Sequence, residues 1–429
     1  MYISYVAEPA ATPRPVIFAF NGGPGSSSVW VHFGLGPRRV ADIDLLQPRT
    51  APPFAIEDNP DSLLDVADLV FIDPPGTGFS RVLDEDKLSE FYSVTGDAAA
   101  TLRFVSAWSR RHRRENAPKF LLGESYGAIR AAAMANLATG GPTQTGRIES
   151  LAFNGVMLLG ANLDLHQQAE LEWVNVLPSL AATAWYHDRV PDRPSDLGEH
   201  VDAARRFAAT EYLTALYEGT ALEPARRDAV VARLHQLTGL DPAFIVEHDL
   251  RISTTIFADS LLGDQNRQTG MYDSRYVLSK AGRTMDPVAD DPAMGQYVPS
   301  FAGVVGPYLR DELGADRDEP YHVIDFGRVN SRWDWGDGPG RLRAANYAHD
   351  LAAVMRRNAD FELFAASGWF DLVTPAGSLR YSVSRAPLDP KRTHFGTYES
   401  GHMPYLGREP RALLVQELRE FVLRVSGKA

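Results

Sequence analysis

The first 160 residues alternate between short, continuously apolar runs and longer segments with helical spacing. Continuous apolar strands separated by helices are typical of a parallel sheet that is covered on both faces. We therefore expect an α/β fold with a mostly parallel central sheet. The expected strands are residues 15–20, 68–73, 119–122 and 151–159, and the expected helices between them are 97–108 and 128–137.

The pattern changes between about residues 162 and 335, where helical stretches dominate and loops rich in Pro, Asp and Gly separate them. The alternation of strand and helix then resumes to the end of the chain. We predict three parts: a first part of the core (1–161), a mainly helical cap insertion (162–335) and a second part of the core (336–429). The later elements expected are helices 167–177, 199–217, 224–237, 302–312, 343–357 and 410–425 and strands 361–366 and 393–398.

The composition of the chain argues against several classes of function. The net charge of −12 argues against nucleic-acid binding, which needs clustered Lys and Arg. The absence of cysteine excludes disulfides and thiol catalysis, and we expect no metal or other cofactor. No apolar run is long enough to span a membrane. The start, residues 1–6, reads as a strand without a lead-in or a signal peptide, so we expect that upstream residues are missing.

The strongest chemical signal is Gly123-Glu-Ser-Tyr-Gly127. A serine with glycine two positions away on each side fits the nucleophile elbow, a strained turn between a strand and a helix. The apolar run before Ser125 and the alanine-rich helix after it supply that context. The alternative is a chance match on a tight turn, which the surrounding strand and helix disfavour. Ser125 is therefore the candidate nucleophile.

A serine hydroxyl needs a base, and the base needs a carboxylate to orient it. In α/β-hydrolases these partners follow in the order Ser, Asp, His, after late strands. Asp371 lies just past an expected strand, and His402 lies in a glycine-flanked loop after the last one, unlike its neighbour His394. Asp371 as a simple helix cap is the alternative. We predict a triad of Ser125, Asp371 and His402.

A second motif, Asn21-Gly-Gly-Pro-Gly-Ser-Ser-Ser28, directly follows the first clear strand. Acyl transfer needs N–H donors aimed at the developing oxyanion. One donor in this fold is the N–H after the nucleophile, here Tyr126, and the other comes from an early loop for which Gly22 and Gly23 are suited. The alternatives are a plain turn or a phosphate-binding loop, and the latter lacks its Gly-Lys-Ser/Thr ending.

Together these residues resemble the serine carboxypeptidase family of α/β-hydrolases. The matching blocks run in the family's order and span nearly the whole chain: Asn21–Ser28, Phe71–Ser80, Gly123–Gly127, Gly368–Asp371 and Gly401–Pro404. The resemblance implies removal of single C-terminal residues from peptides through an acyl-enzyme, with the helical insertion as a cap. It also implies that Asn21 and Glu124 hold the terminal carboxylate of the peptide substrate and that Gly23 and Tyr126 are the oxyanion donors.

The chain departs from the family pattern at three positions, where Ala19, Ser26 and Gly34 stand in place of the usual Trp, Cys and Glu. Since relatives place a second Glu in the carboxylate network at the position of Gly34, this network is expected to be thinner, with Arg130 either a compensating charge or part of a structural ion pair. In its lack of cysteine, the chain resembles a bacterial branch of the family. This resemblance suggests that the protein is periplasmic or secreted.

Two other functions remain open at this point. An esterase or acyltransferase would use the same triad, and a non-enzymatic binding protein would keep only the fold. The intact Ser, Asp, His and glycine loop argue against the second. The sequence pattern carries no information on the oligomeric state.

Overall fold

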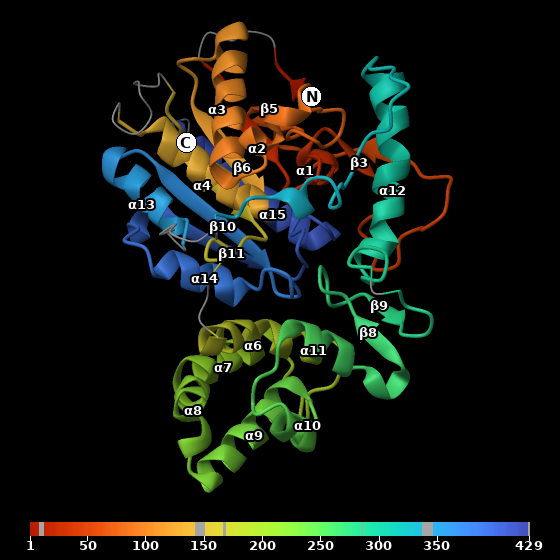
Figure 1. The fold of residues 1–429 in the computed structure, drawn as a ribbon, viewed down its shortest axis with the longest axis vertical. Coiled ribbons are helices and arrows are strands. Elements are labelled where there is room, and N and C mark those ends of the chain that lie inside the picture. The colour runs from red at the N-terminus through yellow and green to blue at the C-terminus, as the bar shows by residue number, and fades with distance from the viewer. Residues whose placement is uncertain (8–12, 142–150, 166–168, 285, 337–345, 428–429) are drawn as a thin grey trace.

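The computed structural model describes residues 1–429 except 8–12, 142–150, 166–168, 285, 337–345 and 428–429. Its centre is a seven-stranded sheet with the order β1-β5-β2-β6-β7-β10-β11 (Figure 1). All neighbouring pairs are parallel except β1 with β5. The strands are β1 (Tyr2–Tyr5), β2 (Val16–Phe20), β5 (Asp68–Ile72), β6 (Lys119–Glu124), β7 (Gly155–Leu159), β10 (Glu362–Gly368) and β11 (Thr393–Tyr398).

Both faces of the sheet are covered, which explains why its strands are apolar at successive positions. In β2, Val16, Phe18 and Phe20 belong to one apolar cluster, and Ile17 and Ala19 to the cluster on the other side. The first cluster is completed by α3 (Val94–Arg111), α4 (Tyr126–Ala138), α13 (Ala348–Arg357) and α14 (Ala376–Ser384), and the second by α1 (Val29–Leu35), α12 (Met294–Pro307) and α15 (Arg408–Val425). The α/β-hydrolase class expected from the sequence is confirmed.

A helical lobe lies beside this sheet lobe (Figure 1). It has an apolar core of its own, and Leu372, from the loop after β10, takes part in that core. Phe370 of the same loop packs with Ala182 and Leu197 in a smaller cluster. The helical lobe therefore supports the loop that carries Asp371. Its helices are α6 (Ala169–Tyr186), α7 (Leu197–Phe207), α8 (Leu213–Glu218), α9 (Pro224–Thr238), α10 (Pro242–Glu247) and α11 (Thr254–Ser260).

The predicted insertion, 162–335, is not one packing unit. Its later helix α12 packs through Tyr297 and Phe301 against Trp30 of α1, within the apolar core of the sheet lobe. Between α11 and α12 runs a hairpin of β8 (Arg267–Thr269) and β9 (Val277–Ser279). The division of the chain at 162 and 336 thus stays a prediction, and the separate helical core comprises residues 174–262 together with Leu372.

Several element boundaries differ from those expected. The helix expected over 199–217 is α7 and α8 joined by a π-helical turn, Ala208–Tyr212, and α12 ends in a similar turn, Tyr308–Glu312. The expected strand 151–159 pairs only from Gly155. Parts of two expected helices, 167–168 and 343–345, lie outside the described residues. The other short strands and α-helix of the described residues are β3 (Arg38–Val40), β4 (Ile56–Asp58) and α2 (Leu88–Phe91).

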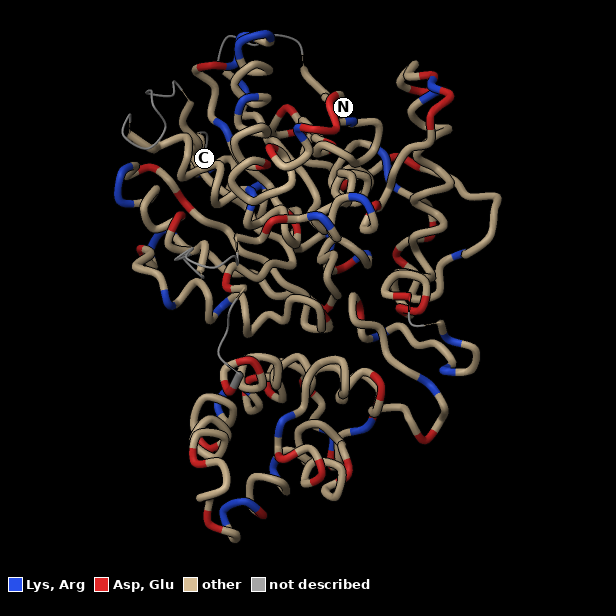
Figure 2. The backbone as a smooth tube through the Cα atoms, in the orientation of Figure 1, with Lys and Arg blue, Asp and Glu red and all other residues tan. Residues whose placement is uncertain are grey.

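Charged residues of both signs are distributed over the described part of the chain. Figure 2 shows Lys and Arg interspersed with Asp and Glu along both lobes. Among the described residues, no helix is long and apolar enough to cross a membrane. In the same part of the chain, no group of three or more His, Cys, Asp or Glu side chains is arranged to hold a metal ion.

Candidate active site

Ser125 sits where β6 ends and α4 begins, with φ 58° and ψ −129°. This is a strained backbone conformation for a residue with a side chain, and such strain is found at functional turns. The glycines around it allow the turn to pack closely. A Cβ on Gly127 would lie 2.9 Å from the carbonyl oxygen of Phe20 and 3.0 Å from that of Asn21. The turn therefore lifts the Ser125 side chain above the carboxyl end of the sheet.

Asp371 and His402 are brought together by neighbouring strands. Since β10 and β11 run parallel, the loops at their carboxyl ends lie side by side, and Phe370 N donates to the Ser400 carbonyl at 3.0 Å. The Nδ1 atom of His402 lies 2.9 Å from Asp371 Oδ2. Asp371 is fully buried and His402 is 3% exposed. The carboxylate is thus placed to orient the imidazole and to stabilise its charged form.

Thr374, which the sequence analysis did not identify, completes this pair. Its hydroxyl donates to Asp371 Oδ2 at 2.6 Å and lies 3.0 Å from His402 Nδ1. The backbone N–H groups of Val373 and Thr374 both donate to Asp371 Oδ1 at 2.8 Å. Part of this arrangement had a sequence signal, because an Asp side chain in a loop commonly accepts hydrogen bonds from the backbone N–H groups that follow it. The role of the Thr374 hydroxyl had none.

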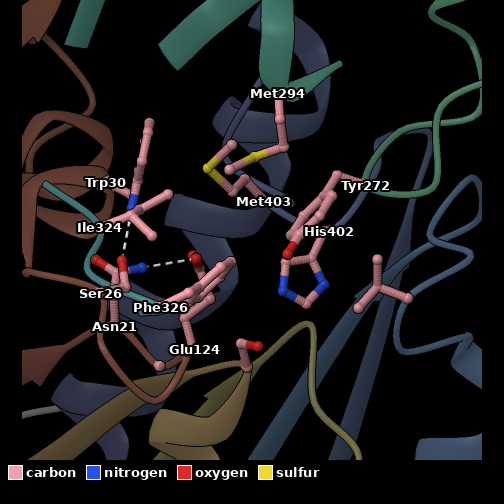
Figure 3. Close-up of a pocket in the computed structure, with 14 residues that line it drawn as sticks. Asn21, Ser26, Trp30, Glu124, Tyr272, Met294, Ile324, Phe326, His402 and Met403 are labelled. Atoms are coloured by element: carbon pink, nitrogen blue, oxygen red, sulfur yellow. Dashed lines mark hydrogen bonds between the residues drawn. The ribbon is translucent and has the colours of Figure 1, made fainter. Parts of the chain in front are cut away.

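Ser125 and His402 line the same cavity, which is open to solvent and has a volume of about 550 Å³ when the space at its mouth is included. Among the described residues, the buried Nε2 atom of His402 has no hydrogen-bond partner, so the Ser125–His402 bond is not formed here. In ligand-free sites such bonds are often long and tighten when substrate binds. Figure 3 shows His402 beside Tyr272 at the wall of the cavity, with Met294 and Met403 above.

The glycine loop after β2 forms the opposite wall. Gly22 packs against the backbone N atom of Tyr126, and a side chain at position 22 would overlap it. Gly23 has φ 101°, a conformation that favours glycine, and it lines the cavity beside Ser125. Because Tyr126 is the first residue of α4, its N–H has no partner within the helix. Two backbone donor positions thus lie near the candidate nucleophile.

Asn21 and Glu124 form a buried pair at the end of the cavity. Asn21 Nδ2 donates to Glu124 Oε1 at 2.6 Å (Figure 3). Asn21 Oδ1 accepts from Val31 N at 3.1 Å. Burial raises the pKa of Glu124 to about 7, although the nearby His402 and the bond from Asn21 oppose the rise. A carboxyl group that stays protonated near neutral pH can donate a hydrogen bond to an anion.

The pKa of Glu124 makes stability depend on pH. The folded protein keeps this proton up to about pH 7, whereas the unfolded chain releases it near its ordinary value of 4.5. Folding is therefore less favourable as pH rises through this window, by up to about 3 kcal/mol. We expect Glu124→Gln to be more stable relative to the wild type at pH 8 than at pH 4.5. Urea unfolding at both pH values measures this, with exposed Glu85→Gln as control; an equal difference at both would contradict it.

His402 has a pKa shifted in the direction that a base needs. Burial alone would lower the pKa of His402, but the charge of Asp371 and its hydrogen bond raise it above the ordinary value. A base with a raised pKa takes a proton from a serine more readily. As the pH falls, His402 therefore takes up a proton at a higher pH than an ordinary histidine does.

Gly34 leaves room for Tyr405, a second residue that the sequence analysis did not identify. A Cβ at position 34 would overlap the Tyr405 ring. The Tyr405 hydroxyl is buried, makes no hydrogen bond of normal geometry to a described residue, and lies close enough to Glu124 to help lower the pKa of that carboxyl. No sequence signal connects positions 34 and 405, which are far apart along the chain.

Arg130 does not reach the cavity. It is 1% exposed and pairs with the equally buried Asp97 at 2.6 Å. Of the two roles considered for Arg130, the structure places it in an ion pair and away from a substrate carboxylate. Other residues that sequence reasoning missed are the apolar lining residues Trp30, Met294, Ile324 and Phe326.

Comparisons with known proteins agree with this geometry. A family model described as serine carboxypeptidase matches residues 1–212, just under half of the chain, including the glycine loop and the Ser125 turn. The protein "Serine carboxypeptidase-like 51" of Arabidopsis thaliana is 30% identical over 160 residues, which are 36% of this chain and 31% of that protein. The matched segment thus spans about a third of the length of this curated relative.

The likeness in fold extends over the whole chain. The crystal structure of Kex1(delta)p, a prohormone-processing carboxypeptidase from Saccharomyces cerevisiae, matches with a TM-score of 0.59 and 16% identity, covering 99% of this chain and 86% of that one. At this identity the match supports a shared fold. The first half of this chain is therefore similar in sequence to the serine carboxypeptidases, and the whole chain has the α/β-hydrolase fold.

Proposed function

We propose that this protein is a serine-type carboxypeptidase with Ser125 as nucleophile, His402 as base and Asp371 as the orienting carboxylate. The observation that carries the proposal is the buried Asn21–Glu124 pair in the same cavity as Ser125. An esterase needs the triad and the oxyanion donors, but it does not need a protonated carboxyl group at the end of its cavity. A terminal carboxylate of a peptide suits that group, since one shared proton removes the repulsion between two carboxylates.

The proposed reaction uses only groups of this chain and water. His402 takes the proton of Ser125 as its oxygen attacks the carbonyl carbon of the last peptide bond. The resulting oxyanion accepts hydrogen bonds from the N–H groups of Gly23 and Tyr126. His402 then returns the proton to the departing amine, and the terminal amino acid leaves. Water, activated by the same histidine, releases the shortened peptide from Ser125.

The cavity supports a preference for apolar terminal residues. Most of the other lining side chains are apolar or aromatic: Trp30, Tyr272, Met294, Ile324, Phe326, Val373 and Met403. The polar exception, Ser26, accepts the indole N–H of Trp30 at 2.8 Å. A charged side chain buried there without a partner would lose its hydration. The absence of cysteine supports the further proposal that the chain is a bacterial-type member of the family.

A peptide series that differs only in its last residue tests this proposal. We expect peptides ending in Phe, Leu or Met to be trimmed about 10- to 100-fold faster, by kcat/KM, than those ending in Lys or Asp. Met294→Asp should raise the rate for peptides that end in Lys. Met294→Leu, which keeps the side-chain volume nearly constant, should leave the ranking of the peptides by rate unchanged. Release of the last residue is followed by mass spectrometry. Equal rates across the series would contradict the preference, and no release from any peptide would contradict the proposed function.

A further inference from the structure

Asp97 and Arg130 form the most deeply buried ion pair near the site among the described residues, yet neither lines the cavity. Asp97 lies on α3 and Arg130 on α4, both 1% exposed. A buried ion pair is weak evidence for stability, because removing two charges from water costs about as much as their attraction returns. The contacts of this pair point to another role.

Arg130 reaches the glycine loop from behind. Its Nη1 atom donates to the carbonyl oxygen of Asn21 at 2.7 Å, while Nε pairs with Asp97. The Asn21 carbonyl and the Gly22 N–H form one peptide group, and Gly23 is the next residue along the loop. Gly22 and Gly23 have no side chains with which to pack. The bond from Arg130 therefore restrains a part of the loop that cannot restrain itself.

Asp97 reaches the other side of the site. Its Oδ2 atom accepts the hydroxyl of Tyr126 at 3.1 Å as well as Arg130 Nε at 2.6 Å. The guanidinium also lies over the rings of Phe20 and Tyr126, at 5.1 and 5.2 Å from their centroids. One ion pair thus contacts both chain segments that present backbone N–H donors beside Ser125: the Asn21–Gly23 segment and Tyr126.

We propose that Asp97 and Arg130 are positioning residues that set the spacing of the two oxyanion donors, Gly23 and Tyr126. The inference rests on the serine-hydrolase chemistry of the proposed function and does not need its carboxypeptidase specificity. Donors of this kind act only when they are held where the oxyanion forms, and a displacement of about 1 Å can cost about 100-fold in rate. The guanidinium is suited to this task because it is planar and rigid, so its Nε bond to Asp97 and its Nη1 bond to the Asn21 carbonyl are held in a fixed relative direction.

The test uses the Asp97→Asn/Arg130→Gln double variant, which leaves no unpaired buried charge. Three quantities are measured: hydrolysis of a p-nitrophenyl ester, which has no terminal carboxylate to read; the affinity for a phenylboronic acid, which forms a tetrahedral adduct on serine; and the affinity for a product peptide. We expect kcat to fall about 10- to 100-fold and boronate affinity to fall by a similar factor, with KM and product affinity changed less than about threefold. Arg114→Gln, which breaks the ion pair with Asp68 at the amino end of β5, is the matched control and should keep kcat.

Tyr126→Phe is the second variant and decides the matter if the double variant does not fold. It removes only the hydroxyl that Asp97 holds, and we expect kcat and boronate affinity to fall about three- to tenfold, by the loss of one hydrogen bond. A folded variant of either kind with unchanged kcat and boronate affinity would overturn the proposal. So would parallel losses in boronate and product affinity, which would mark a merely structural role. If the wild type hydrolyses the ester but trims no peptide, the carboxypeptidase proposal fails while this one stands.

Discussion

Ser125→Ala and His402→Ala are each expected to lower kcat by about 10⁴- to 10⁶-fold, and the double variant is expected to be little worse than either one. The reason is that the base has no proton to take without the serine, and the serine is a weak nucleophile without the base. Asp371→Asn should cost about 10⁴-fold, because the imidazole loses the carboxylate that its Nδ1 atom contacts at 2.9 Å.

Steady-state kinetics on one peptide measures these losses. His394→Ala is the matched control, since His394 pairs with Glu362 at 2.8 Å and lies on β11 instead of in the loop after it. It should keep nearly full activity. Losses that multiply in the Ser125→Ala/His402→Ala variant would contradict the claim that these two residues act as a unit.

The rate at which a peptide with a free C-terminus is hydrolysed is expected to fall steeply above about pH 7. The rate for the matching C-terminal amide is expected to show no such fall. Glu124 has a pKa raised to about 7, so its donor proton is lost above that pH and two carboxylates then repel each other. Below neutral pH both substrates slow down, because His402, with its raised pKa, takes up a proton. The free acid should therefore give a narrow bell-shaped profile.

At the optimum pH the free acid should be cleaved about 10- to 100-fold faster than the amide, by the loss of one or two hydrogen bonds to a charged group. Glu124→Gln should flatten the alkaline fall for the free acid, because an amide donates a hydrogen bond at any pH. Profiles of kcat/KM from pH 5 to 9 for both substrates measure this. If the loss of rate at alkaline pH persists unchanged in Glu124→Gln, a group other than Glu124 causes that loss.

Local patterns along the chain were sufficient to predict most of the sheet lobe. The apolar runs became β2, β5, β6 and β10 because a strand covered on both faces must be apolar at successive positions. The turn at Ser125 could be predicted for a similar reason, since its close backbone contacts require glycine at positions 123 and 127. These features depend on residues within a few positions of each other.

Features that depend on distant contacts could not be predicted. The helix expected at 302–312 begins earlier, at Met294, and contains Pro299 and Pro307, because packing against α1 outweighs the cost of proline in a helix. Met294 thereby reaches the cavity, which no local pattern indicates. The same holds for Tyr405 against Gly34 and for Arg130 against Asn21, whose pairing arises only when the sheet is assembled.

The most direct test of the central claim is one time course with one peptide in two forms. The free acid and its isotopically labelled C-terminal amide are mixed with the enzyme at pH 6.5, and the masses of all products are recorded. We expect the free acid to lose residues one at a time from its C-terminus, the amide to lag far behind, and Ser125→Ala to leave both intact. Internal cleavage, trimming from the N-terminus, or equal consumption of acid and amide would contradict the account.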